Sequence, residues 1–219
     1  QPAIAKHYNT TVQQISKTFR RMGIPARSFA EGDRLRIKDI ELTDNDREII
    51  DGCLLGDGCI DERSFTSSFR YTCKHRSVVE DLASRLSFPC RITKRVKNNS
   101  THYNLGSLSY PSLLEIRHRW YQPKKIVPKD LVLSPKVCYW WYLGDGTSIN
   151  HELRLFTNAF PVEDVQWLVS CFPIEASFWI MRNHAAPEPV IRVKTASIKD
   201  FFEYIGPCQH SDYRYKWFM

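Results

Sequence analysis

The sequence lacks the features that would assign it to a membrane, a secreted or a simple metal-binding class. No stretch is long and apolar enough to span a bilayer, and the N-terminus shows no signal-peptide pattern. The seven cysteines form no C-x-x-C pair and no metal-like cluster. We therefore expect no membrane partner, and we expect reduced cysteines in an intracellular protein of the cytoplasm or of an organelle.

Acidic side chains are the minority among the charged residues. The 219 residues include 31 Lys and Arg against 24 Asp and Glu, which gives a net charge of +7. This excess favours a polyanionic partner, although so mild an excess is weak support by itself. The length suits one large domain, or one domain with a small appendage.

Two apolar runs end in the same four residues, Leu-Gly-Asp-Gly, at residues 55–58 and 143–146. Each run has a helix-start signal upstream. Thr43 and Asp46 have the spacing of a capping box, and Ser134 precedes a proline at the first helical position. The sequence therefore predicts two buried helices, each of which stops at a glycine just past an aspartate.

The glycine before each aspartate would allow the two helices to pack closely. Because Gly56 and Gly144 lack a Cβ atom, the backbones can approach there, and Asp57 and Asp145 would emerge side by side. Two adjacent carboxylates repel unless a positive group lies between them, and a hard divalent cation is the usual solution. The alternative is a pair of ordinary Asp-Gly turns that cap two core helices.

The segments that follow the two motifs share one order of elements, which favours a duplication over two chance turns. Phe-Pro pairs at residues 88–89 and 172–173 end equivalent helices. Glu115 and Glu203 both lie 58 residues after their aspartate (115 − 57 and 203 − 145). We therefore predict an α+β fold with a pseudo-twofold duplicated α-β-β-α-β-β-α unit and two antiparallel sheets.

Four segments follow from this pattern: residues 1–42 form an N-terminal segment with a linker, 43–123 the first half, 124–134 the inter-repeat linker and 135–219 the second half. The N-terminal segment has the pattern of a small helix-turn-helix. Apolar residues recur at 12, 15, 19 and 22, before Gly23.

Basic residues lie off this apolar stripe of the N-terminal segment. Residues 1–42 hold eight Lys and Arg against four Asp and Glu, which is +4 of the net charge of +7. Lys17, Arg20 and Arg21 stand where a recognition helix would meet DNA. The alternative is a helical hairpin whose basic face is only solvated.

One face of each predicted sheet would be covered by helices, and the other would be free and rich in basic, polar and aromatic side chains. A long basic β-surface of this kind, shaped as a saddle, fits duplex DNA, because strands can enter the major groove. The expected DNA contacts are Arg63, Arg70, Lys74, Arg95, Lys97, Arg154, Trp179, Arg182, Asn183 and Arg192.

The duplicated helix that ends in Gly-Asp-Gly resembles the LAGLIDADG homing endonucleases in their single-chain, two-motif form. Residues 124–131 before the second motif and residues 215–217 near the C-terminus also look like that family, so the resemblance covers about residues 43–219. The motifs depart from the family name at Asp51, Trp140 and Trp141, which replace small or aliphatic residues. Trp140 matches Gly52 of the first copy, so it can face the first helix only if its partner leaves room.

The resemblance implies the homing-endonuclease fold and a monomer that cuts both strands of a long, double-stranded DNA site. Cleavage would cross the minor groove, use Mg²⁺ and leave short 3′ overhangs. Mn²⁺ is expected to substitute for Mg²⁺, and Ca²⁺ to bind without supporting cleavage. By resemblance, Asp57 and Asp145 are the metal-binding acids, assisted by the carbonyl groups of Gly56 and Gly144.

The family also implies a supporting lysine late in each half and a polar residue that positions water. Lys194 lies 49 residues after Asp145 and fits the lysine, whereas the same offset in the first half reaches Gly106. The alternative for Lys194 is a strand lysine that contacts phosphate or lies on the surface. Asn158 fits the water-positioning residue, and Cys73 is its expected first-half counterpart.

Two other functions remain open from the sequence. One is nucleic-acid binding without cleavage on the same fold, either as an intron maturase with intron RNA as a partner or as a DNA-binding regulator. The other is a basic α/β protein whose Asp-Gly turns are only helix caps, with no dependence on divalent metal. No splicing block flanks the motifs, so an intein origin is not supported.

Overall fold

The computed structural model describes residues 2–24, 38–97, 99–149, 151–181 and 188–217. The chain divides into two compact units, Gln1–Lys38 and Asp39–Met219. The larger unit begins four residues before the boundary expected from the sequence, because Leu42 packs in its core and Asp39 accepts a 3.0 Å hydrogen bond from the Ser112 amide. Within the described ranges, no helix has the length and apolar character needed to cross a membrane.

The smaller unit contains the two helices expected for the N-terminal segment, α1 (Pro2–His7) and α2 (Val12–Arg21). Thr11 caps α2 as its sequence position predicts, since its hydroxyl accepts a 3.2 Å hydrogen bond from the Gln14 amide. Among the described residues of these helices only Ala5 is buried.

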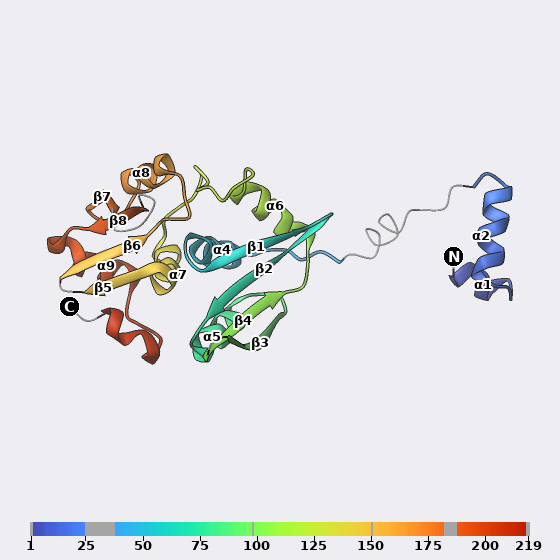
Figure 1. Cartoon of the computed structure of the whole chain (residues 1–219), viewed down its shortest axis with the longest axis horizontal. Helices are drawn as coiled ribbons and strands as arrows, with labels where there is room; N and C mark the ends of the chain where they lie inside the picture. The colour runs from blue at the N-terminus through green and yellow to red at the C-terminus, as the bar shows by residue number, and fades with distance from the viewer. Residues whose placement is uncertain (1, 25–37, 98, 150, 182–187, 218–219) are drawn as a thin grey trace. The chain divides into compact units, whose positions relative to one another are not determined.

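The larger unit repeats one series of elements twice (Figure 1). The first series is α4 (Asp44–Leu55), β1 (Gly58–Arg63), β2 (Thr66–Cys73), α5 (Arg76–Arg85), β3 (Cys90–Lys97), β4 (Ser100–Ser107) and α6 (Pro111–Trp120). The second is α7 (Pro135–Asp145), β5 (Gly146–Ile149), β6 (Glu152–Phe156), α8 (Val162–Ser170), β7 (Ala176–Met181), β8 (Glu188–Val193) and α9 (Ile198–Ile205), with 3₁₀ turns at Thr195–Ser197 and Ser211–Trp217.

The strands form two four-stranded antiparallel sheets with equivalent topology. Their orders are β1-β2-β4-β3 and β5-β6-β8-β7. The registers match as well, because the last glycine of each motif pairs with the next strand, Gly58 with Tyr71 and Gly146 with Leu155. The predicted α+β duplication is therefore confirmed. The short strand β5 is the one strand that the sequence pattern did not single out.

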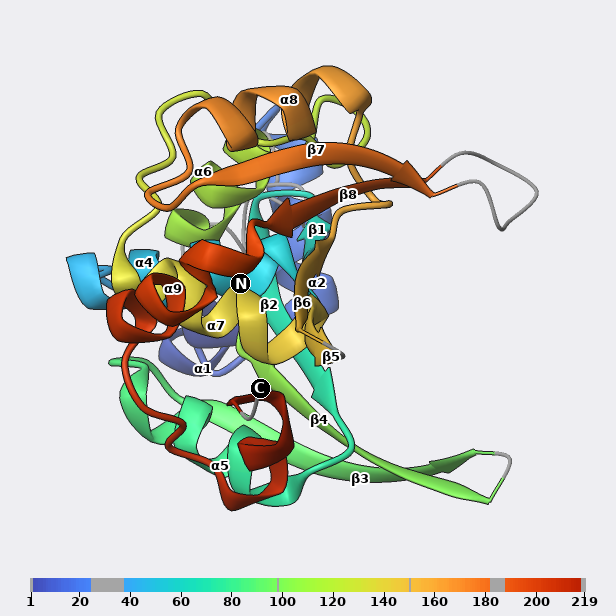
Figure 2. The ribbon, with the colours of Figure 1, turned by 90° about the vertical axis from the view of Figure 1, so that its left-hand side faces the viewer.

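The two motif helices, α4 and α7, lie side by side between the sheets (Figures 1 and 2). Their contact depends on Gly52, where an added Cβ atom would lie 2.5 Å from the Val137 carbonyl oxygen and 2.8 Å from the Trp140 Cβ atom. Gly52 therefore leaves the room that Trp140 requires. Trp140 and Trp141 are both buried in the core that the two halves share.

The predicted helix starts are present, and one helix end differs. Thr43 and Asp46 form a reciprocal capping box, with a 2.9 Å hydrogen bond from the Thr43 amide to the Asp46 carboxylate. Ser134 caps α7 through the Val137 amide. However, α4 ends at Leu55 with Gly56 as its cap, so the first helix stops before its aspartate.

The acidic residue within the first motif, Asp51, is buried but fully paired. It accepts a 2.8 Å hydrogen bond from the Arg119 guanidinium and another of 2.8 Å from the Trp120 indole nitrogen. A buried carboxylate is tolerated when charged and neutral donors satisfy it. This departure from the family motif is thus matched by two residues of α6.

Candidate active site

Two glycines let the central helices approach closely where the motif aspartates lie. A Cβ atom placed on Gly56 would lie 3.5 Å from the Cα atom of Gly144. One placed on Gly144 would lie 3.1 Å from the backbone nitrogen of Asp57 and 3.5 Å from its Oδ2 atom. The close backbone packing expected from these glycines is therefore present, and it brings Asp57 next to the Gly-Asp pair of the second motif.

The two motif carboxyl groups interact electrostatically. Burial, and then the negative charge of Asp57, raises the pKa of Asp145 to about 6. Burial also raises the pKa of Asp57, although its side chain still reaches solvent. Lys125 and Lys216 oppose both shifts. Two carboxylates that are costly to ionise together would be stabilised by a cation between them.

This donor set fits a hard divalent cation such as Mg²⁺. Among the described residues, no third Asp, Glu, His or Cys completes a metal-binding group with Asp57 and Asp145. Mg²⁺ is commonly held by one or two carboxylates, with water and phosphate oxygens as its other ligands. The two aspartates therefore suit a cation that is shared with a phosphate group.

Two lysines that the sequence patterns did not single out lie beside the motif ends. The Lys216 ammonium donates a 2.8 Å hydrogen bond to the Leu143 carbonyl and lies 3.4 Å from the Gly144 carbonyl oxygen. The Lys125 ammonium donates a 3.1 Å hydrogen bond to the Gly58 carbonyl. Burial lowers the pKa of Lys125 to about 8, and acidic groups led by Asp145 oppose this shift. Each half thus supplies one cationic group to its own motif.

A positional signal for these lysines exists in the sequence. Lys125 lies 68 residues after its aspartate (125 − 57), and Lys216 lies 71 residues after its own (216 − 145). Both follow the third helix of their half, in segments without the regular periodicity of a helix or a strand. Comparing the two halves beyond their third helices would have found them.

Lys194, the lysine expected from the resemblance, lies in a different environment. Its side chain is exposed and forms an ion pair with Glu175. It is not among the groups that shift the pKa of either motif aspartate. The structure therefore favours Lys125 and Lys216 over Lys194 for the charge beside the aspartates.

Asn158 lies in an exposed turn after β6. Because β6 pairs with β5, which directly follows the second motif, this turn lies at the aspartate end of the sheet. Tyr71 and Leu155 are opposite the last motif glycine of their halves. Three residues further along stand Lys74 and Asn158, respectively. Lys74, rather than the expected Cys73, is therefore the first-half counterpart of Asn158.

The strand register gathers basic residues on the open face of the first sheet. Arg70 pairs with Gly106, which pairs in turn with Arg91, and alternation places every second residue on the same face. Lys74 continues this alternation beyond β2, and the Lys97 side chain lies outside the described part. The exposed basic residues of this face within the strands are Arg63, Arg70, Arg91 and Arg95. Arg91 was not predicted.

The open face of the second sheet carries a preformed cluster. Arg154 and Arg192 both pair with Glu152, the latter at 2.7 Å. The Arg154 guanidinium also lies 5.3 Å from the ring centre of Trp179, which is 44% exposed. The predicted contacts Arg182 and Asn183 lie outside the described residues. In the first sheet, by comparison, Arg70 pairs with Asp61.

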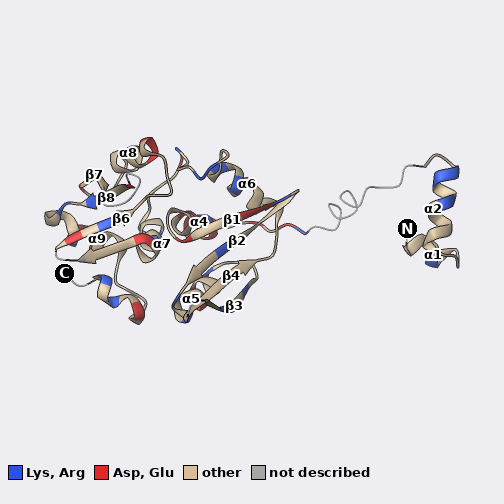
Figure 3. Cartoon of the chain, in the orientation of Figure 1, with Lys and Arg blue, Asp and Glu red and all other residues tan. Residues whose placement is uncertain are grey.

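Basic residues also mark α2 of the smaller unit, where Lys17, Arg20 and Arg21 are exposed. Figure 3 shows Lys and Arg on this helix and on strands of both sheets. All predicted basic contacts whose side chains are described are thus at least partly accessible.

Known proteins share this sequence and this architecture. The model of the LAGLIDADG DNA endonuclease family matches residues 47–201. The uncharacterized protein MJ1098 of Methanocaldococcus jannaschii is 32% identical over 136 residues, which cover 56% of this chain and 53% of that protein. Cytochrome b mRNA maturase bI2 of Debaryomyces hansenii is 27% identical over 100 residues, covering 44% of this chain and 36% of the maturase. The matches thus span about half and about a third of these relatives.

A solved structure has the same fold. The homing endonuclease I-WcaI bound to its DNA recognition sequence superposes with a TM-score of 0.68 at 18% identity. The superposition covers 91% of this chain and 96% of that one. The homing-endonuclease architecture expected from the two motifs is therefore confirmed.

Proposed function

Because the chain belongs to the LAGLIDADG DNA endonuclease family, we propose that it is a site-specific endonuclease that hydrolyses both strands of a duplex DNA target. The observation that carries this proposal is the pairing of Asp57 with the second motif, where the charge of Asp57 raises the pKa of Asp145. Lys125 and Lys216 place two cationic groups beside this pair. Such a site suits a phosphodiester with a divalent cation.

The residues of the site take separate roles in this proposal. Asp57 and Asp145 would hold Mg²⁺, with Gly56 and Gly144 offering carbonyl oxygens; Mn²⁺ would substitute, and Ca²⁺ would bind without supporting cleavage. A bound cation supplies Lewis-acid stabilisation of the phosphate and a more acidic water. The Lys125 and Lys216 ammonium groups offset negative charge that develops on the phosphate oxygens. Asn158 orients the attacking water in the second half, and Lys194 contacts a DNA phosphate.

The DNA would lie along the open faces of the two sheets. The first sheet offers Arg63, Arg91 and Arg95 to phosphates and base edges, and the second offers Arg154 and Arg192 beside Trp179. A monomer suffices, because one chain contains both aspartates. The two cuts would cross the minor groove and leave short 3′ overhangs.

Cleavage is expected to fail in acid because protons compete with the cation. Asp145 has a raised pKa of about 6, so below that pH the group is protonated and cannot act as a metal ligand. At subsaturating Mg²⁺, the single-turnover rate should fall about tenfold per pH unit below this pKa. Raising the Mg²⁺ concentration should shift the acid limb to lower pH. An acid limb that is independent of Mg²⁺ would contradict metal binding by Asp145.

The proposal is tested by selecting cleaved molecules from a randomised duplex library. We expect one long site with staggered 3′ ends in Mg²⁺, and no cut ends in EDTA. Uniform cutting without a preferred sequence would contradict site specificity. Retention of a defined duplex without cutting, in either Mg²⁺ or Mn²⁺, would overturn the nuclease.

The second candidate is a maturase that binds intron RNA on the same fold. The likeness to the cytochrome b mRNA maturase bI2 favours it, although that match covers 36% of the maturase. Tight binding to a structured intron RNA, together with retention of DNA without cutting in the library selection, would support this function over the endonuclease.

A further inference from the structure

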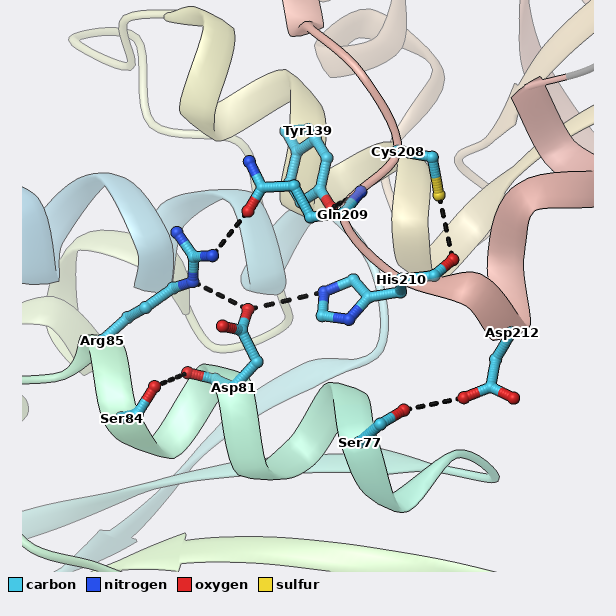
Figure 4. A network of polar contacts seen from close by, with 9 residues as sticks. All are labelled: Ser77, Asp81, Ser84, Arg85, Tyr139, Cys208, Gln209, His210 and Asp212. Atoms are coloured by element: carbon cyan, nitrogen blue, oxygen red, sulfur yellow. Dashed lines mark hydrogen bonds and ion pairs between the residues drawn. The ribbon is translucent and has the colours of Figure 1, made fainter.

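The segment that carries Lys216 leaves the second half and contacts the first half before it returns. We call residues 207–217, which follow α9, the C-terminal strap. Ser77 of α5 donates a 2.7 Å hydrogen bond to Asp212 of the strap, and His210 lies 3.4 Å from the Asp81 carboxylate. Arg85 donates to Gln209. The strap is thus fastened to one face of α5 (Figure 4).

The other end of the strap is fixed to the second motif helix. The Tyr142 hydroxyl donates a 2.6 Å hydrogen bond to the Lys216 carbonyl, and the Lys216 ammonium caps the end of α7. Between the two ends, the Tyr213 hydroxyl lies 3.2 Å from the Cys73 sulfur. Lys216 therefore occupies its position beside the aspartates through contacts with both halves.

The inter-repeat linker holds Lys125 in a related manner. Asp164 of α8 accepts a 2.9 Å hydrogen bond from the Val127 amide and a 2.7 Å hydrogen bond from Lys129. Asp164 is buried and belongs to the second half, whereas Lys125 contacts the first motif. Each cationic group beside the site is thus carried by a segment that a carboxylate of the opposite half anchors.

We propose that α5 and α8 position the two lysines across the halves, with Ser77 and Asp81 positioning Lys216 and Asp164 positioning Lys125. This inference rests on the proposed endonuclease function. Neither anchor touches the reacting atoms; each sets where an ammonium group stands. Because an ångström of displacement can cost about a hundredfold in rate, loosening one anchor should affect the cut that its lysine serves.

The test measures the two strand cuts separately on the duplex that the library selection recovers, with a different dye on each strand. Lys216→Ala and Lys125→Ala identify which strand depends on each lysine. The Ser77→Ala/Asp81→Asn variant should slow the Lys216-dependent strand at least about fivefold relative to the other and accumulate nicked DNA. Asp164→Asn should shift this ratio in the opposite direction.

The matched control is Glu80→Gln. Glu80 lies on α5, but it pairs with Arg76 and not with the strap, so both strand rates should stay at the wild-type value. Ser77→Ala alone is the milder variant if the double variant folds poorly. Hydrogen exchange gives a readout apart from activity: amides of residues 207–217 should exchange faster in the anchor variant, while those of α7 should not.

Three outcomes overturn the inference. One is equal slowing of both strands by Ser77→Ala/Asp81→Asn, which is the signature of general destabilisation. The second is slowing of the same strand by both anchor variants. The third is unchanged exchange of the strap. Wild-type protein that cuts neither strand would overturn the proposed function and this inference with it, whereas wild-type cutting with an unaltered strand ratio in the variants overturns only the inference.

Discussion

Asp145→Asn protein is expected to lose double-strand cleavage, with a rate reduction of at least about a thousandfold, because the amide cannot replace a charged metal ligand. Loss of residues that only support a metal ligand typically costs about 10- to 100-fold, so loss of the ligand itself should cost more. Asp57→Asn should have an effect of similar size. Single-turnover assays on a duplex labelled on both strands measure the loss.

The same substitution should leave DNA binding intact and stabilise the fold. Burial and the charge of Asp57 raise the pKa of Asp145, so its ionised form is unfavourable at neutral pH in the metal-free protein. A neutral amide removes this repulsion, and the melting temperature without metal should rise. Asp61→Asn is the control, because Asp61 pairs with Arg70 on the first sheet and not with the motif ends. Wild-type cleavage by Asp145→Asn would refute the site.

Gly52→Ala should cause the largest loss of stability among the glycine substitutions compared below. The added Cβ atom would lie 2.5 Å from the Val137 carbonyl oxygen, and a backbone atom in a packed helix cannot rotate away. We expect a loss of about 3 kcal/mol in the free energy of unfolding, the upper part of the usual range for overpacking. For a unit of this size, the melting temperature should fall by roughly 6 to 12 °C.

Gly106→Ala provides the matched control for this prediction. At Gly106, no heavy atom of the described residues lies within 4 Å of an added Cβ atom. Its unfolding midpoint should therefore stay close to that of the wild type in a chemical denaturation experiment. Equal midpoints for the Gly52 and Gly106 variants would show that the two motif helices are not held at the described distance.

The sequence could predict the elements whose signals are local. Thr43 and Asp46 mark a helix start because a capping box involves residues three apart, and the structure contains that box. The duplicated motifs likewise predicted the helix pair, because glycine at residues 56 and 144 permits close approach whatever the rest of the chain does. Alternation along the strands correctly grouped Arg70 with Arg63 on one face.

The lysines beside the site could not be predicted in this way. Lys125 and Lys216 lie after the third helix of each half, and long-range contacts, not local periodicity, bring them back to the motifs. Lys194 was favoured because it ends a strand before a helix, but its neighbour Glu175 was invisible at that separation. The end of α4 at Leu55 also depends on packing against α7 rather than on the Asp-Gly pair.

The fit of Gly52 against Trp140 makes the two halves non-interchangeable partners. The motifs correspond at an offset of 88 residues (145 − 57), so Trp140 stands where the first half has Gly52. A symmetric dimer of the first half would set glycine against glycine and leave a void. A symmetric dimer of the second half would force tryptophan against a helix backbone that offers no hollow. Exchange of halves between related enzymes should therefore succeed only when this glycine and this tryptophan travel as a pair.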